Sequence, residues 1–330
     1  MQENIDFLGN INSICFLDDN HIVVSTKENS SIFIYDETGK QILHIARQGN
    51  GPFEYLNPAI VRCDKERRLI YVWCNYTSKM VIFDEKGTPV NEFRISRSID
   101  NFQLYQDYIL FYLSTGDIHR DVIGVYDMIS STFIFTYGTA SEEHNLLSLN
   151  ETSGGITILN ESLLYAYADK PEFFLLNLSY FDSNIQTKSY KALNTTDFKA
   201  QPLNGIKSIY LINYQRNKAL EYIRSNSVIN GLFTIDDHVV LKAKAGTLEV
   251  QNEIITKYER YDVFYVFDKD LNYLFHSENT FLVTELFVPD RLFASNGKDL
   301  YFIALNNTTD ETKQYSLNRI IFDKNDPKDD

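Results

Sequence analysis

Short runs of alternating apolar and polar residues dominate this chain, and turn-forming residues separate them. The stretch Met80–Phe93 shows the pattern clearly, because three apolar residues precede Phe83, turn residues fill Asp84–Gly87, and apolar residues then alternate again. This arrangement predicts two antiparallel strands joined by a tight turn. Similar runs, rich in Val, Ile, Phe and Tyr and bounded by Asn, Asp and Gly, recur along the whole sequence. They predict an all-β fold.

An aromatic residue followed by aspartate recurs six times at the ends of predicted strands. The copies are Tyr35-Asp36, Phe83-Asp84, Tyr126-Asp127, Phe181-Asp182, Phe267-Asp268 and Phe322-Asp323. Most steps between copies are roughly 40–55 residues, which is the length of one propeller blade. A single blade cannot bury both of its faces, so neighbouring blades have to stack. We therefore predict a six-bladed β-propeller that forms one domain over residues 1–330.

Two parts of the chain depart from the repeat. The long step between Asp182 and Asp268 contains an extra segment at about 193–226, in which Tyr214–Arg224 has apolar residues spaced for one helix face. We predict a partly helical insertion there. The last blade has too little chain for its fourth strand, and an open edge is avoided in natural sheets. Because Ile5 and Phe7 alternate with polar residues, we predict that the N-terminus closes the ring beside Ser316–Asp323.

Charge and hydropathy narrow the classes of partner. The net charge of −14 argues against nucleic acid and against an anionic membrane surface, since both are bound through Lys and Arg. No run of eighteen apolar residues is present to span a membrane. Residues 1–10 lack the basic and apolar regions of a signal peptide. The chain is therefore cytoplasmic if Met1 is its true start, or a leader has been removed.

The three cysteines are Cys15, Cys63 and Cys74. Their odd number and wide spacing argue against a disulfide framework and against a zinc site. Cys15 and Cys63 fall at equivalent places on the first strands of two blades. We expect them to be small buried residues with free thiols.

Known catalytic and cofactor motifs do not occur in the sequence. Gly49 and Gly51 are followed by Pro52 rather than by a third glycine and a helix, so they are not a dinucleotide fingerprint. Serine-hydrolase, zinc-protease and EF-hand patterns are also missing. His21 and His238 occupy matching positions after Asp-Asp turns, which predicts a packing role repeated from blade to blade.

Polar and aromatic residues gather in the loops that join the second and third strands of each blade, and in the connections between blades. These loops, which include Lys244–Tyr261, share one face of a propeller, which is the usual mouth of its central funnel. The candidate site residues on this loop-rich face are Arg47, Tyr76, His119, Arg120, Lys170 and Tyr258. Cations and aromatics around a concave mouth suit an anionic or sugar-like ligand. The alternative is an ordinary exposed loop surface.

A resemblance to a known family rests on the join between the first two blades. The sequence there is RQGNGPFEY (residues 47–55), followed by Pro58, RRLIYVW (residues 67–73) and KMVIFDEKG (residues 79–87). It resembles the Gly-x-Gly-Pro-x-Glu-Tyr signature of six-bladed propellers common in Bacteroidetes cell envelopes, and more broadly the TolB-like and NHL-like propellers. The resemblance covers about residues 9–96 in detail and implies an exported protein or lipoprotein with a binding role. By its composition alone the stretch predicts a turn, in which Glu54 accepts hydrogen bonds from loop amides.

Two functions from different classes follow. The first is a monomeric, non-enzymatic binding or scaffold propeller of the periplasm or outer membrane, without a cofactor, that recognises a glycan, a peptide or an envelope protein on the loop-rich face. The alternative is a metal-assisted hydrolase or lyase that acts in the central channel, with calcium as the candidate ion. Three or more Asp, Glu, Asn or His side chains converging in the channel would favour the enzyme. An aliphatic or aromatic lining would favour binding.

Overall fold

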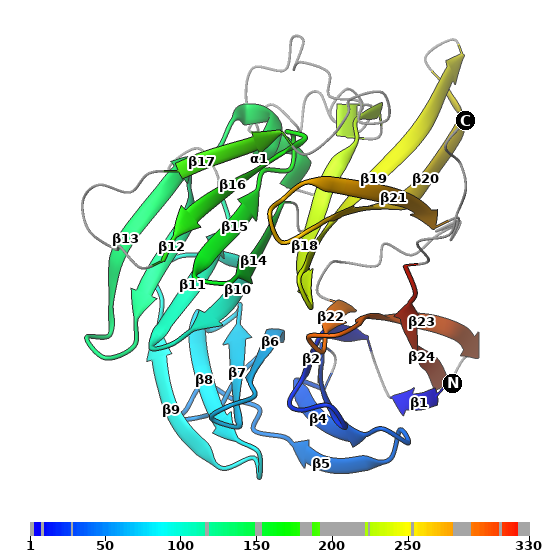
Figure 1. The fold of residues 1–330 in the computed structure, drawn as a ribbon. Coiled ribbons are helices and arrows are strands. Elements are labelled where there is room, and N and C mark those ends of the chain that lie inside the picture. Colours follow the sequence, from blue (N-terminus) through cyan, green and yellow to red (C-terminus); the bar gives the residue numbers. More distant parts are fainter. Residues whose placement is uncertain are drawn as a thin grey trace.

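The computed structural model is a ring of six four-stranded antiparallel sheets (Figure 1). It describes residues 3–7, 10–27, 29–115, 119–148, 154–178, 187–191, 222–223, 225–251, 254–279, 292–309 and 312–322. Each sheet is one blade, and the blades follow one another clockwise around the ring in the view of Figure 1. The six-bladed β-propeller predicted from the sequence repeat is confirmed.

The strands of each blade run in chain order from the channel outward, apart from the last blade. Blade 1 consists of β2 (Ile11–Phe16), β3 (His21–Thr26), β4 (Ser31–Asp36) and β5 (Gln41–Ile45). Blade 2 consists of β6 (Pro58–Asp64), β7 (Leu69–Cys74), β8 (Lys79–Asp84) and β9 (Pro89–Arg94). Blade 3 consists of β10 (Ile99–Tyr105), β11 (Tyr108–Leu113), β12 (Asp121–Asp127) and β13 (Thr132–Thr139). Blade 4 consists of β14 (Gly155–Leu159), β15 (Ser162–Ala166), β16 (Glu172–Asn177) and β17 (Thr187–Lys191). Blade 5 consists of β18 (Val228–Ile235), β19 (His238–Gln251), β20 (Ile254–Phe267) and β21 (Tyr273–Asn279). Blade 6 consists of β22 (Phe293–Ser295), β23 (Leu300–Thr309), β24 (Thr312–Ile320) and β1 (Glu3–Phe7).

The N-terminal strand closes the ring. β1 pairs antiparallel with β24, with Ile5 opposite Tyr315 and Phe7 opposite Lys313. This confirms the predicted closure, although β24 begins and ends a few residues earlier than the predicted strand Ser316–Asp323. The sequence of β24 is largely polar in its first half, and its pairing with β23 and β1 makes it a strand.

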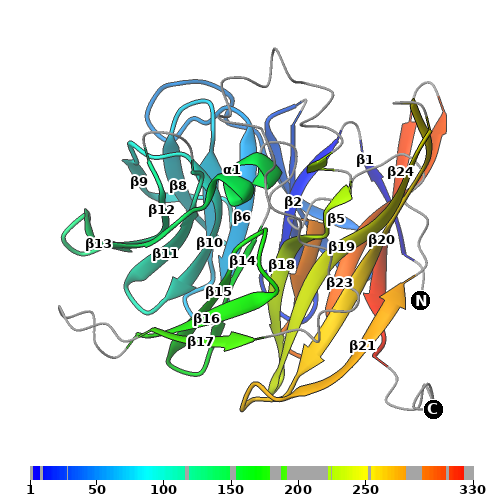
Figure 2. The same ribbon diagram turned by 90° about the horizontal axis from the view of Figure 1, so that it is seen from above.

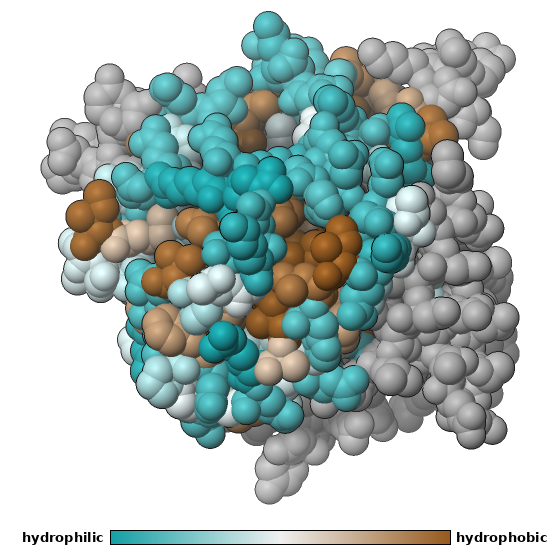
Figure 3. Space-filling model, turned by 90° about the horizontal axis from the view of Figure 1, so that it is seen from below, coloured by the Kyte–Doolittle hydropathy of each residue, from teal (hydrophilic) through white to brown (hydrophobic). Residues whose placement is uncertain are grey.

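The apolar core lies in layers between neighbouring blades. One buried cluster joins blades 1 and 2, with Val23, Val61 and Phe83 among its members. Corresponding clusters join each following pair of blades, and the last one joins blade 6 to blade 1. The outer strands instead face solvent, and Figure 3 shows polar side chains around an apolar patch on the side of blades 1 and 2. Ile42 of β5 and Val90 of β9 are about half exposed there.

The repeated aromatic–Asp pair has a structural explanation in the outer hairpins. Asp36 Oδ1 accepts the N–H groups of Thr38 and Lys40, and Asp84 Oδ1 accepts those of Lys86 and Thr88. Asp127 and Asp268 accept turn N–H groups in the same way, whereas Asp182 and Asp323 lie outside the described residues. These side-chain hydrogen bonds build the turn between the third and fourth strands. The preceding aromatic residue is buried between blades in all four described copies.

One segment differs from the sequence-based expectation, and a second lies almost entirely outside the described residues. The predicted loop Lys244–Tyr261 is mostly strand, because β19 and β20 pair from Val239–Phe267 out to Gln251–Ile254. Figure 2 shows this hairpin reaching past β18 and β21. The polar sequence of this stretch is typical of a loop, but backbone pairing within a hairpin needs no apolar face. The predicted helix Tyr214–Arg224 and the rest of the insertion at about 193–226 lie outside the described residues, apart from 222–223 and 225–226.

Candidate functional site

A short helix that the sequence reasoning missed occupies the loop-rich face. α1 (Glu142–Ser148) lies between blades 3 and 4, near one end of the ring (Figure 2). Ser141 begins the helix, since its Oγ accepts the N–H of His144 at 3.0 Å, and Glu142 and Glu143 fill the first turn. A capping serine before two acidic residues is a usual helix start. That signal was present in the sequence, but the strand pattern on either side concealed it.

The buried side chain of His144 fixes α1 to blade 4. Its Nδ1 accepts the backbone N–H of Ala168 at 3.0 Å, so the neutral ring carries its proton on Nε2. The ring packs edge-on against Tyr112 and Tyr167. Burial lowers the pKa of His144 to about 4, and the positive charge of Lys170 contributes to the same shift. The helix is therefore held in one position at neutral pH.

Asp169 completes the contact between α1 and blade 4. The Oγ of Ser141 donates to Asp169 Oδ2 at 2.7 Å, and burial raises the pKa of the Asp169 carboxyl. The other oxygen, Oδ1, is buried and has no hydrogen-bond partner among the described residues. Ser141 thus links the start of the helix to a carboxylate in the loop between β15 and β16.

Two of the predicted site residues, Arg120 and Lys170, belong to loops that contact the start of α1. The backbone C=O of Arg120 accepts the N–H of Ala140, and its Nη2 lies 4.0 Å from Glu142 Oε1. Lys170 Nζ lies 5.1 Å from the centre of the Tyr167 ring. Both cations are therefore carried by segments that contact the helix. Exposed His119 precedes Arg120 in the same loop.

The remaining predicted residues are not brought to this helix by any contact within the described part of the chain. Arg47 and Tyr76 are exposed on the loops of blades 1 and 2, and Tyr76 is 71% exposed. Tyr258 pairs with Leu248 in the long hairpin, but its side chain lies outside the described residues.

The pH dependence of stability should report the buried imidazole. Below its ordinary pKa of 6.5 the unfolded chain takes up a proton at His144, whereas the folded chain does so only below about 4. Stability is therefore lost as the pH falls through this window, by a cost on the order of 3 kcal/mol. His144→Asn keeps an acceptor for the Ala168 N–H but does not titrate. We expect urea midpoints measured from pH 7 to pH 4 to fall more steeply for the wild type than for this variant.

Asp169 acts in the opposite direction and is present in both proteins. Its raised pKa means that acidification favours the folded form through this group, so the comparison between wild type and variant removes its effect. Parallel pH profiles would show that His144 is not held neutral by its burial.

The signature loop at residues 47–55 has a structural role. Glu54 Oε2 accepts the N–H of Gly51 at 2.8 Å, and a Cβ at Gly49 would lie 2.0 Å from the same oxygen. The nearly buried Lys79 donates to Gly51 O at 3.0 Å and pairs with Glu92 at 2.9 Å. The interpretation of this stretch as a turn in which Glu54 accepts loop amides is confirmed.

The other end of the channel holds a cavity that the sequence reasoning did not place. It has a volume of about 400 Å³ and is lined by all six innermost strands, mainly toward their C-terminal ends. Its polar groups include Arg62, Asn101 and Gln103, whereas Phe233 and Phe293 contribute apolar surface. No carboxylate and no imidazole belongs to this lining. Within the described ranges there is also no group of three or more His, Cys, Asp and Glu that could hold a metal ion.

The prediction of free thiols was wrong for two of the three cysteines. Cys15 of β2 and Cys63 of β6 form a disulfide with a Cα–Cα distance of 5.9 Å. Their separation of 48 residues is one blade step, so equivalent positions on adjacent innermost strands come within disulfide range. Cys74 is free and buried, and burial raises the pKa of its thiol to about 12.

α1, the helix that the structure describes in full, is much too short to cross a membrane.

Comparisons with known proteins agree with this architecture. The chain is similar in structure to a member of the DUF4221 family from Bacteroides vulgatus (TM-score 0.65, 11% identity, 97% of each chain covered). It is also similar to a putative exported protein from Bacteroides fragilis (TM-score 0.55, 12% identity, 97% of this chain and 95% of that chain covered). No curated protein matches the sequence.

A family model described as a 6-bladed beta-propeller, DUF5128, matches residues 4–270. The match spans most of the chain, from the closing strand β1 to the end of β20, the third strand of blade 5, and its description agrees with the six sheets of the structure. With its neighbours from Bacteroides, the chain has the architecture of a Bacteroidetes-type propeller. It belongs to the DUF5128 family of six-bladed β-propellers.

Proposed function

We propose that this chain is a non-enzymatic binding propeller of the cell envelope that recognises an acidic glycan or peptide on the loop-rich face around α1. One observation carries the proposal: the loops that carry Arg120 and Lys170 both contact the start of a helix that buried contacts hold in place. In a chain with a net charge of −14, these two cations are the groups that this part of the face offers to a negatively charged ligand, which competes with Glu142 for Arg120. His119 of the same loop, and Arg47 and Tyr76 across the face, complete the proposed surface.

Two observations support a location in the periplasm or at the outer membrane, after removal of a leader. Disulfides persist in oxidising compartments, and Cys15 is bonded to Cys63. A structurally similar protein is described as a putative exported protein. The proposed location agrees with the resemblance of residues 47–55 to the signature of envelope propellers.

The alternative, a metal-assisted hydrolase or lyase, needs carboxylates or histidines that converge in the channel. The cavity in the described part of the channel is lined by amides, hydroxyls, aromatics and two cations. Nothing in this lining favours hydrolytic chemistry over binding, so binding remains the proposal.

The experiment is a titration of immobilised protein with oligogalacturonate and with poly-glutamate, compared with neutral dextran. Arg120→Ala combined with Lys170→Ala should weaken binding of the acidic probe by about tenfold or more and flatten its salt dependence. The matched control is Lys40→Ala with Lys86→Ala, which removes two exposed cations from turns at the other end of the blades. Equal losses in the two double variants, or equal binding of acidic and neutral probes, would exclude this site.

A further inference from the structure

The channel cavity at the end opposite α1 has two unlike walls. On one side, blades 2 to 4 contribute the polar side chains of Arg62, Gln103 and Thr157. On the other side, blades 5 and 6 contribute the large apolar residues Leu232, Phe233 and Phe293, together with the smaller polar residues Thr234 and Ser295. A volume of about 400 Å³ is within the range of small-molecule sites, which typically combine an apolar lining with a few convergent polar groups. The cavity therefore suits a ligand with one polar end and one apolar end.

Arg62 is held in a fixed orientation at the polar wall. Its Nε donates to Phe102 O at 3.1 Å, its Nη1 donates to Val61 O at 2.7 Å, and its Nη2 donates to Asn101 Oδ1. The guanidinium carbon also lies 5.8 Å from the centre of the Phe102 ring. A half-buried, pre-organised guanidinium loses little freedom when it binds an anion.

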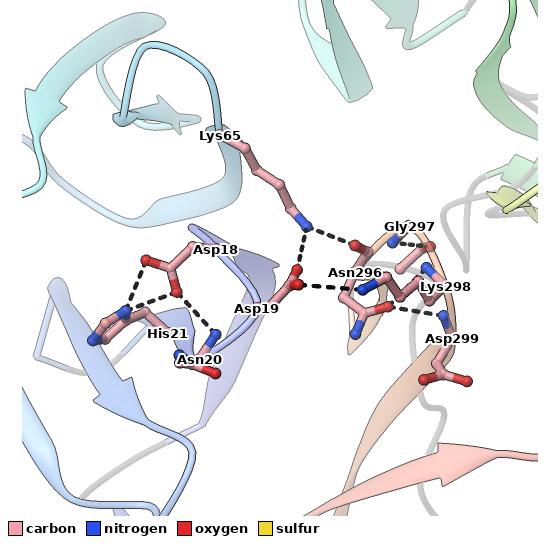
Figure 4. Close-up of polar contacts among 10 residues, drawn as sticks. Asp18, Asp19, Asn20, His21, Lys65, Asn296, Gly297, Lys298 and Asp299 are labelled. Carbon is pink, nitrogen blue, oxygen red and sulfur yellow. Dashed lines mark hydrogen bonds and ion pairs between the residues drawn. The ribbon is translucent and has the colours of Figure 1, made fainter.

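The distribution of charge favours a ligand with one negative charge. Arg62 and Lys65 are the two cations of the lining, and no carboxylate accompanies them there. Lys65 Nζ lies 3.6 Å from Asp19 at the rim, and Lys298 Nζ reaches the same carboxylate at 3.5 Å (Figure 4). Arg62 is thus the cation deeper in the cavity. Water screens the more exposed rim charges, so the interior offers one strong partner for one anionic group.

Covalent and polar links hold the rim and wall together. The disulfide of Cys63, the neighbour of Arg62, ties β6 to β2. Lys65 Nζ donates to Asn296 O at 2.6 Å and so joins the turns of blades 2 and 6, as Figure 4 shows. Because these links fix the walls of the cavity, binding there does not require loops to become ordered.

We infer from this geometry that the cavity binds a small organic carboxylate with an aromatic or branched apolar group. The carboxylate contacts the guanidinium of Arg62, and the apolar group lies against Phe233 and Phe293. This site is separate from the proposed surface around α1, and its ligand is a small molecule.

The test uses 3-phenylpropionate as the probe, followed by ligand-observed NMR and calorimetry on the full chain in its oxidised form. We expect saturable binding of the carboxylate, with binding of the neutral 3-phenylpropan-1-ol weaker by about tenfold. Arg62→Met should bring the affinity for the carboxylate down to that for the alcohol. Arg67→Met is the matched control, since Arg67 lies in the same blade and pairs with Asp107 on the surface; it should bind like the wild type.

A second variant covers the case in which Arg62→Met does not fold. Ser295→Trp fills the cavity from the rim and leaves Arg62 and its hydrogen bonds in place, so it should abolish binding of the probe. Equal affinities for the carboxylate and the alcohol would overturn the proposal, as would undiminished binding by Ser295→Trp.

Discussion

The double variant Cys15→Ser, Cys63→Ser should lose roughly 4 kcal/mol of unfolding free energy, if the disulfide acts mainly on the unfolded chain. The bond closes a loop between residues 48 apart. In the unfolded chain this link removes conformational freedom that grows with loop length. In the folded ring it joins the innermost strands of blades 1 and 2. A loss of this size is a large part of the roughly 5–15 kcal/mol that stabilises a typical domain.

Urea denaturation of the oxidised wild type and of the double variant measures this loss. Dithiothreitol should lower the midpoint of the wild type to that of the variant and leave the variant unchanged. Cys74→Ala is the matched control, because it removes the free buried thiol and keeps the disulfide; its midpoint should still respond to reduction. A wild-type midpoint that does not respond to dithiothreitol would mean that the bond is absent or contributes nothing.

Deletion of residues 1–8 should cost about 3 kcal/mol and promote association between molecules. The deletion removes β1, which pairs with β24 from Glu3–Leu317 to Phe7–Lys313. It leaves β24 as an open edge and uncouples the first blade from the last, so the cost exceeds that of trimming an ordinary terminus. Calorimetry should show a clearly lower melting temperature, and light scattering should show oligomers that increase with concentration.

The control for this truncation removes residues 323–330 from the other end, where the sequence predicts a polar tail. That protein should melt within a degree or two of the full chain, since few apolar groups are removed. The ring-closing role of the N-terminus would be refuted by a protein without residues 1–8 that melts normally and stays monomeric.

The blade architecture could be predicted because its signals are local and repeated. Asp36 and Asp84 each follow a buried aromatic residue and accept amides of the next turn, so the same pair marks each hairpin in the sequence. Ring closure could be predicted from the missing fourth strand. The turn role of Glu54 followed from glycines that leave room for its carboxylate.

The site could be predicted only in part, because it depends on which blades face one another. Arg120 and Lys170 belong to different blades, and the start of α1 contacts the loops that carry both of them. The disulfide was missed because one blade step separates residues that are adjacent in space. The cavity was missed because its lining comes from six separate strands, and a single arginine in a strand such as β6 carries no signal of the space beside it.

Hydrogen exchange of the chain with and without saturating oligogalacturonate tests the central claim, that the α1 face is the binding surface. The account predicts slower exchange in residues 119–121, 140–148 and 168–172, with no change in the turns at 36–40 and 84–88. Slower exchange confined to the opposite end of the ring, at residues 16–20, 62–66 and 295–298, would contradict it. So would unchanged exchange throughout the chain.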